Sequence, residues 1–307
     1  MQPHYDRKTA GYITLYQFMK LASFCIILFF LFVKNTFSQT SNGEVSSLVA
    51  AENYFEGIAK EKGIRKALIT VSDDETIIFR PGPVKALNYF EKQKADDSQL
   101  SWHPILAKIS RSGDWGFTTG PYQYRSDENL TYGDYVSVWK MNNKGVWKLA
   151  IDMGISHKKP LSEPKLMFID PKSHRFFRQK SEARKQQRED MILTSDILFS
   201  KTLEKYDNLA YNVFIADEAR LLFPGHEPII GKRNIADFLR LKELEIQTEP
   251  TKADRALGSD LAYTYGQAKI TRKGSITAYH YMRIWEVQDG FKWNVILEIF
   301  TPAESEF

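Results

Sequence analysis

Cysteine is nearly absent from this chain of 307 residues, since Cys25 is the only one. It lies in an apolar segment near the N-terminus, and the rest of the chain has no thiol. That part can therefore hold no cysteine nucleophile, no thiolate metal site and no disulfide. The lack of a free thiol is compatible with an oxidising compartment.

Sequence motifs for cofactors and metals are also missing. The chain has no phosphate loop, no dinucleotide fingerprint, no GxSxG elbow and no HExxH pair. Five of the six histidines follow the predicted signal peptide and stand singly, and each is more readily explained as a structural or surface residue than as a metal ligand. These are His103, His157, His174, His226 and His280. We therefore expect neither a cofactor nor a bound metal.

The chain has little net charge. Its formal charge is +4, and it falls to +1 without residues 1–38, which carry Arg7, Lys8, Lys20 and Lys34 against Asp6. Proteins that bind nucleic acids usually present a broad basic surface. The charge balance therefore argues against nucleic acid as a partner.

A long apolar run is absent as well, because residues 21–33 form a run of only 13 residues. A bilayer-spanning helix needs about 20, whereas this length is typical of a signal peptide. Thr36 and Ser38 are small residues before a cut at Gln39. We predict a signal peptide at 1–38, with Met19 as an alternative start, and a periplasmic or secreted mature chain without membrane contact. The alternative is an uncleaved N-terminal anchor.

The chain does contain an internal repeat. With an offset of 146 residues, the segment 114–153 aligns to 260–299 without a gap. The matches are Asp114, Thr118, Gly120, Thr131, Tyr135, Trp139 and Trp147 with Asp260, Thr264, Gly266, Thr277, Tyr281, Trp285 and Trp293. Two tryptophan pairs at one spacing indicate a duplicated domain. We predict copy one at 44–157, a linker at 158–180 and copy two at 181–303.

Both copies show the same order of predicted elements. In copy one, apolar periodicity predicts helices at 46–62 and 84–94, short extended pieces at 67–71 and 76–79, and strands at 101–109, 114–125, 132–141 and 146–153. In copy two it predicts helices at 191–206 and 235–244 and strands at 260–271, 278–287 and 292–300. The charged segment 172–190 either extends the first of these helices as a solvated face or forms a recognition patch.

The repeated motifs resemble those of the nuclear transport factor 2-like superfamily, in its SnoaL-like branch. They are Ser112–Gly120, Gly133–Trp139 and Gly145–Leu149, together with Gly258–Gly266, Tyr281–Trp285 and Trp293 in copy two. The resemblance implies an α+β fold of two tandem cone-shaped domains, each a curved antiparallel sheet packed on N-terminal helices. It also implies a pocket between helices and sheet, and two sheets that pair within one chain, which leaves the mature chain a monomer. The fold hosts isomerases, dehydratases, hydrolases and non-catalytic binders, so it does not define the activity.

Strand alternation places Tyr135 and Trp139 on one face of copy one, and Tyr281, Arg283 and Trp285 on the equivalent face of copy two. By the resemblance, this aromatic face lines the cavity and binds the ligand. Arg283 would then suit a carboxylate or phosphate group. The alternative is an arginine that extends from a core strand toward solvent or pairs with a neighbouring acid.

The candidate catalytic residues are Asp152 and Glu298, which occupy equivalent positions in the last strand of each copy. A desolvated carboxylate gains the raised pKa that a general base needs. The alternative is that each carboxylate faces solvent or has a structural role in which it stabilises a neighbouring residue.

Two functions follow from this interpretation. The first is binding of a small, largely apolar ligand in a cone cavity without catalysis. The second is cofactor-free catalysis by a lyase, isomerase or hydrolase with a pocket carboxylate as general acid or base. Because copy one has Ser137 where copy two has Arg283, the comparison favours copy two as the copy with a specific site.

Overall fold

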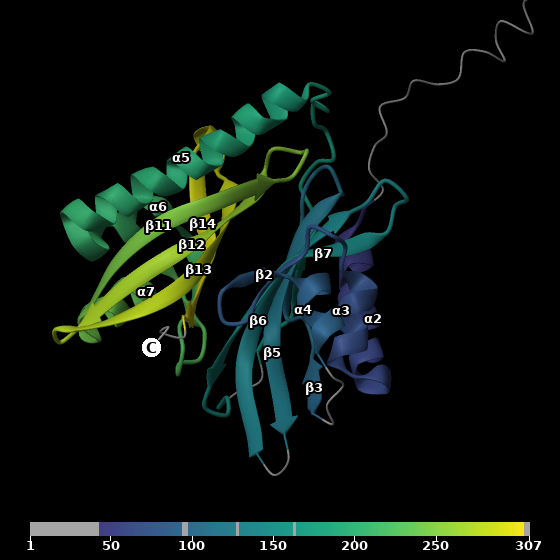
Figure 1. The fold of residues 1–307 in the computed structure, drawn as a ribbon. Helices are drawn as coiled ribbons and strands as arrows, with labels where there is room; N and C mark the ends of the chain where they lie inside the picture. Colours follow the sequence, from purple (N-terminus) through teal and green to yellow (C-terminus); the bar gives the residue numbers. More distant parts are fainter. Residues whose placement is uncertain (1–42, 94–97, 127–128, 162–163, 304–307) are drawn as a thin grey trace, which may run out of the picture. The chain divides into compact units, whose positions relative to one another are not determined.

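The computed structural model describes residues 43–93, 98–126, 129–161 and 164–303 (Figure 1). The predicted signal peptide, Met19 and Cys25 lie outside these residues. No helix in the described ranges combines the length and the apolar character needed to span a bilayer.

Copy one begins with helices and continues into a sheet that we call sheet A. The helices are α2 (Val45–Lys62), α3 (Ile64–Val71) and α4 (Ala86–Lys92). The strands are β1 (Ile77–Phe79), β2 (Pro83–Lys85), β3 (Gln99–Trp102), β4 (Leu106–Ile109), β5 (Trp115–Ser126), β6 (Asn129–Met141), β7 (Trp147–His157) and β8 (Met167–Ile169). Their order is β2-β1-β7-β6-β5-β4-β8, with β3 also paired to β5. The strand β8 comes from the predicted linker, so this segment contributes to sheet A.

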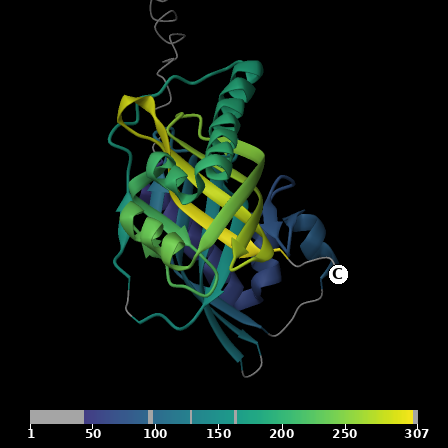
Figure 2. The same cartoon turned by 90° about the vertical axis from the view of Figure 1, so that its left-hand side faces the viewer.

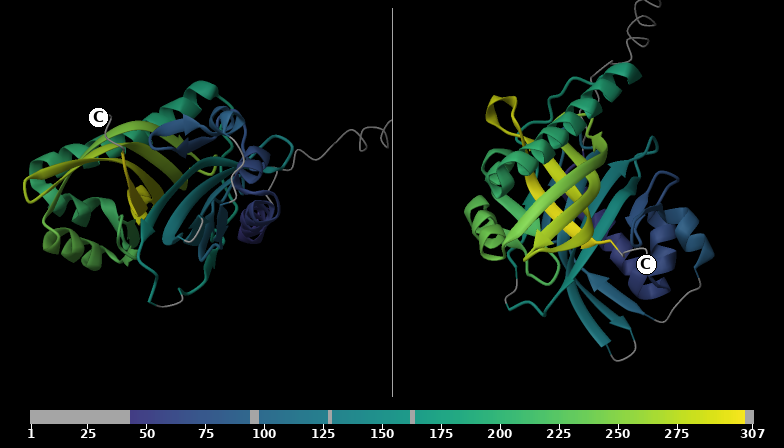
Figure 3. Two further views of the ribbon diagram at one scale, coloured as in Figure 1. Left: turned by 60° about the horizontal axis from the view of Figure 1, so that its bottom comes forward. Right: turned by 60° about the vertical axis from the view of Figure 1, so that its left-hand side comes forward.

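Copy two repeats this plan around sheet B. Its helical elements are α5 (Glu182–Tyr206), η1 (Asp207–Ala210), α6 (Tyr211–Phe214), α7 (Lys232–Leu241) and the short η2 (Asp289–Phe291). The strands are β9 (Ile215–Leu222), β10 (Ile229–Ile230), β11 (Leu244–Arg255), β12 (Leu261–Arg272), β13 (Ser275–Val287) and β14 (Trp293–Pro302), in the order β10-β9-β14-β13-β12-β11. Figures 2 and 3 show α5 lying across the strands of sheet B.

Each sheet has an antiparallel core and a parallel pair near one edge, β1 with β7 and β9 with β14. In sheet A, β8 also pairs parallel with β4 at the other edge. Asn142 and Gly145 form the turn predicted between the long strands β6 and β7. Gly145 has φ +76°, a backbone conformation that favours glycine. The predicted fold class, two tandem α+β domains with a curved sheet packed on N-terminal helices, is confirmed.

Three predicted elements of copy one were wrong in type or extent. Residues 67–71 are helical, because Ala67, Leu68 and Val71 share one buried face of α3. The predicted strand 101–109 is two strands, β3 and β4, separated around Pro104, which has no N–H to donate to β5. The second predicted helix starts only at Ala86, because the residues before it pair with β1.

The two faces of each sheet have different partners. One face packs on the helices of its own copy, and in copy one this core contains Leu48, Phe55 and Trp139. The other faces of sheets A and B share one apolar core, in which Trp115 stacks on Tyr263 with ring centroids 6.3 Å apart. The sheets therefore pair within the chain, whereas the monomeric state stays a prediction.

The repeated motif, Ser112-Gly113-Asp114 in copy one and Gly258-Ser259-Asp260 in copy two, lies where the two copies meet. Asp260 accepts hydrogen bonds from the hydroxyl of Ser110 and from the backbone N–H of Arg111, the latter at 2.8 Å. In return, the N–H of Gly258 donates to Ser112 Oγ at 2.8 Å, and Ser112 donates to Asp114. The motif that revealed the duplication thus connects the duplicated parts.

Candidate functional site

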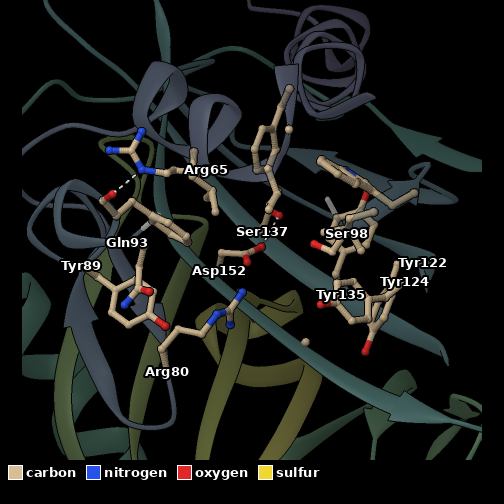
Figure 4. Close-up of a pocket in the computed structure, with 18 of the residues that line it drawn as sticks. Arg65, Arg80, Tyr89, Gln93, Ser98, Tyr122, Tyr124, Tyr135, Ser137 and Asp152 are labelled. Carbon is tan, nitrogen blue, oxygen red and sulfur yellow. Dashed lines mark hydrogen bonds between the residues drawn. The ribbon is translucent and has the colours of Figure 1, made fainter. Parts of the chain in front are cut away.

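Copy one contains a cavity of about 520 Å³ between its helices and the helix-facing side of sheet A (Figure 4). Seven of the twenty residues in its wall are aromatic, among them Phe55, Phe90, Trp102, Tyr122 and Tyr135. Because β6 alternates, the predicted ligand-binding residue Tyr135 and its neighbour Ser137 both face this space, while Val136 and Val138 face the core between the sheets. A cavity of this size with a few polar groups is typical of a small-molecule site.

The carboxylate of Asp152 is one of the polar groups in the cavity wall. Asp152 lies directly opposite Ser137 on the neighbouring strand, and the Ser137 hydroxyl donates to its Oδ1 at 2.8 Å (Figure 4). Burial raises the pKa of Asp152, while the Ser137 hydrogen bond and the charge of Arg80 oppose this rise. The structure thus places this predicted catalytic carboxylate at the cavity.

The hydroxyl of Tyr135 is a second polar group there. Only 7% of the residue is exposed, and its hydroxyl has no hydrogen-bond partner within the part of the chain that the structure describes. Burial, followed by the nearby charge of Glu52, holds the pKa of Tyr135 well above its ordinary value. The group therefore stays protonated and can donate a hydrogen bond to a ligand.

Glu52 is a buried acid on α2 that does not line the cavity but bonds to Trp102, which does. Its carboxylate accepts hydrogen bonds from Trp102 Nε1 at 2.6 Å, Trp139 Nε1 at 2.8 Å and Thr118 Oγ1 at 2.5 Å. Burial raises the pKa of Glu52 to about 7, against the opposing effect of these donors. Trp139, predicted as a ligand-binding residue, is fully buried and orients Glu52.

Glu52 is not among the site residues predicted from the sequence, although its position carries a signal. Glu52 follows Leu48 by four residues and precedes Phe55 by three, so helical periodicity places it on the apolar face of α2. An acid at such a position needs hydrogen-bond donors in the core, and tryptophan side chains can supply them. Which tryptophans do so depends on the pairing of distant strands.

Copy two has a charge cluster in the corresponding space. The guanidinium of Arg283 donates from Nε to Glu298 Oε1 at 2.7 Å and from Nη1 to Asp196, a residue of α5. Tyr211 donates to the other oxygen of Glu298 at 2.8 Å, and Tyr281 donates to Asp196 at 3.0 Å. Trp285 is fully buried beside this cluster and bonds to a threonine instead, Thr264, at 2.8 Å.

The guanidinium of Arg283 also stacks on aromatic rings. Its carbon lies 4.1 Å from the ring centre of Phe199 and 4.5 Å from that of Tyr281. Burial disfavours the charge, but Asp196 and Glu298 outweigh it and raise the pKa of Arg283. Burial likewise raises the pKa of Glu298 against the effect of Arg283. Arg283 is thus paired with neighbouring acids, one of the alternatives that the sequence left open.

The two copies therefore use equivalent positions differently. In copy one, the small Ser137 stands beside Asp152 and the cavity remains open. In copy two, the long side chain of Arg283 reaches both acids and is fully buried. The sequence comparison favoured copy two, yet the cavity described above lies in copy one. The reason is that the side chain of Arg283 fills the corresponding space in copy two, whereas the smaller Ser137 leaves it open in copy one.

Several solved structures are similar to parts of this chain. A ketosteroid isomerase-like protein from Erwinia carotovora atroseptica is 14% identical, with 41% of this chain and 98% of that chain covered and a TM-score of 0.33. An NTF2-like protein from Cytophaga hutchinsonii is 17% identical, with 37% and 97% covered and a TM-score of 0.32. An LEH-like epoxide hydrolase from M. tuberculosis is 14% identical, with 38% and 80% covered and a TM-score of 0.30.

No protein-family model matches the chain, and no curated protein matches it either. Each of these solved structures is similar to about two fifths of the chain. Among the described residues, no group of three or more His, Cys, Asp or Glu side chains could hold a metal ion.

Replacing Arg283 with Met should destabilise the protein by about 3–5 kcal/mol at neutral pH, because it leaves two buried carboxylates without a cation. The free energy of unfolding can be measured with urea. Arg240→Met on α7, where the side chain is largely exposed, is the matched control and should change stability by less than about 0.5 kcal/mol. Equal stability of both variants would contradict a structural role for the cluster.

Glu52 should make stability depend on pH. Because its pKa in the folded protein is about 7, above the ordinary 4.5, the stability it contributes is present below pH 4.5 and is lost as the pH rises through 7. We expect the free energy of unfolding to fall by up to about 1.4 kcal/mol per pH unit in this range owing to Glu52. Urea unfolding of Glu52→Gln should show a shallower decline than the unmodified protein, and parallel declines would exclude this assignment.

Proposed function

We propose that copy one binds a small, largely apolar ligand with one polar end in its cavity. The observation that carries this proposal is the 520 Å³ cavity, in which aromatic side chains lie beside Asp152, Ser137 and the unpartnered hydroxyl of Tyr135. The aromatic side chains would exclude water from the apolar part of the ligand. We also propose a periplasmic or secreted location, on the basis of the N-terminal segment 21–33.

The polar groups define the polar end of such a ligand. Tyr135 can donate a hydrogen bond, and Asp152 can accept one. A hydroxyl group can use both partners at once, whereas a carbonyl group can use Tyr135 alone. Charged side chains, among them Arg65 and Arg80, also line this space, and Arg65 is already bonded to the carbonyl oxygen of Phe90 at 2.7 Å.

Ser137→Arg should close the cavity. The new guanidinium would stand near Asp152 and Glu52 as Arg283 stands near Glu298 and Asp196, so the fold should tolerate it. We expect the neutral apolar probe N-phenyl-naphthylamine, followed by its fluorescence, to bind at least about tenfold more weakly, a loss of about 1.4 kcal/mol or more.

Ser137→Ala is the matched control for this experiment and should bind the probe like the unmodified protein, because it leaves the cavity open. Thermal unfolding of both variants checks that they are folded. Undiminished probe binding by folded Ser137→Arg would show that the ligand site lies elsewhere.

A second function, cofactor-free catalysis by a lyase, isomerase or hydrolase, is favoured by one observation. Asp152 combines a raised pKa with a place in the cavity wall, and Tyr135 next to it can donate to a substrate oxygen. Asp152 would then take up or deliver a proton. Glu298, the equivalent acid of copy two, is bonded to Arg283 and Tyr211 and is 2% exposed.

Asp152→Asn distinguishes the two functions. If the protein only binds a ligand, the affinity of this variant for the apolar probe should stay within about threefold of that of the unmodified protein. In that case the unmodified protein should show no turnover. If it is an enzyme, turnover should fall by about 100-fold to 10,000-fold while probe binding persists. Turnover can be followed by NMR with a panel of epoxides and enolisable ketones, with Asp217→Asn, a change at an exposed acid of copy two, as the control.

A further inference from the structure

A second cavity, of about 870 Å³, lies where the two copies meet. Copy one supplies strand residues that include Asp134 of β6 and His157 at the end of β7, and copy two supplies Arg220 of β9 and Glu227. Trp102 and Tyr122 belong to the walls of both this cavity and the first one.

Arg220 is the unusual residue of this cavity. It is only 9% exposed, yet its side chain has no hydrogen bond or ion pair within the described part of the chain. Along β9 it alternates with Ala219 and Leu221, which belong to the helix-facing core of copy two, so Arg220 points toward copy one. Burial lowers the pKa of Arg220, in contrast to that of the paired Arg283.

Asp134, the acid whose charge acts on Arg220, already has a partner. Its Oδ2 lies 2.6 Å from His157 Nε2, and the other ring nitrogen of His157 donates to the carbonyl oxygen of Lys158 at 2.6 Å. The hydrogen bond to Asp134 raises the pKa of His157 against the effect of burial. Because both ring nitrogens of His157 face acceptors, the pair of Asp134 and His157 has little net charge, and Asp134 only partly offsets the effect of burial on Arg220.

The remaining charges around the cavity leave an excess of positive charge. Glu56 is paired with Lys60 at 2.5 Å, whereas Lys159 and Lys165 lie exposed at the rim without an ion pair among the described residues. Glu227, also exposed, is the one acid of this wall outside those pairs. An anion that enters would meet Arg220 at the buried side and lysines at the rim.

We propose that this cavity is an oxyanion site, in which the carboxylate or phosphate group of a small organic molecule binds Arg220. An arginine in a buried position without a partner is unfavourable, and an oxyanion that accepts two of its hydrogen bonds removes this cost. The apolar wall, which includes Trp102, Pro121, Tyr122 and Pro228, accommodates the rest of the molecule. The site requires both copies and does not depend on the function proposed for the first cavity.

Isothermal titration calorimetry of the purified protein with sodium octanoate and with sodium phosphate tests this proposal. We expect at least one probe to bind with one site per chain, octanoate if the anion is a carboxylate with an apolar body and phosphate if it is a phosphate group. Arg220→Gln should weaken this binding by about 30-fold or more, because it removes the buried cation. Arg220→Lys should bind with intermediate affinity, since it keeps the charge without the paired donors.

Two control variants test whether probe binding depends on this cavity. Arg255→Gln changes a partly buried arginine that bonds to the carbonyl oxygen of Arg188 and lies outside this cavity wall, so it should bind the probe normally. Ser137→Arg, which closes the first cavity, should also leave the affinity unchanged. The proposal is overturned if neither probe binds, or if folded Arg220→Gln binds as tightly as the unmodified protein. If Arg220→Gln does not fold, unchanged affinity of Arg220→Lys overturns it.

Discussion

A buried arginine needs its charge balanced, and in copy two Asp196 and Glu298 provide this balance for Arg283. The three side chains come from α5, β13 and β14, so the cluster joins the first helix of this copy to its last two strands. Copy one has acids at the corresponding places, Glu52 on α2 and Asp152 on β7, but no cation between them. Burial raises the pKa values of Glu52 and Asp152 and so disfavours their negative charge, and neutral side chains donate hydrogen bonds to both carboxyl groups. The presence or absence of one guanidinium therefore decides how the interior of each copy is filled.

The contact between the two sheets imposes the second constraint. Because Val136, Val138, Met282 and Ile284 are buried in a shared core, the alternate side chains of the same strands must face the helices. This fixes Tyr135 and its neighbours toward the cavity. The same contact creates the second cavity, whose wall has residues of both copies. Duplication thus did more than repeat a domain, since it produced a surface that neither copy has alone.

Most of the fold could be predicted from local patterns, and the failures have physical causes. The hairpin of β6 and β7 was predicted well, since strand alternation and the turn at Gly145 are local signals, whereas β11 was not predicted at all. Residues 67–71 were misassigned because a short apolar run suits both strand and helix. The strand predicted at 101–109 was too long because the effect of Pro104 depends on its pairing with β5.

The sequence by itself determined the duplication, most of the long strands, the aromatic face of each sheet and the candidate acids Asp152 and Glu298. These features depend on residue identity and on spacing along the chain. Only the tertiary structure decided that Asp152 borders a cavity while Glu298 is enclosed by Arg283 and Tyr211. It also decided that Glu52 is held by Trp102 and Trp139, and that Arg220 faces copy one unpaired. The reason is that desolvation and charge pairing depend on residues far apart in sequence, which folding brings within a few ångströms of one another.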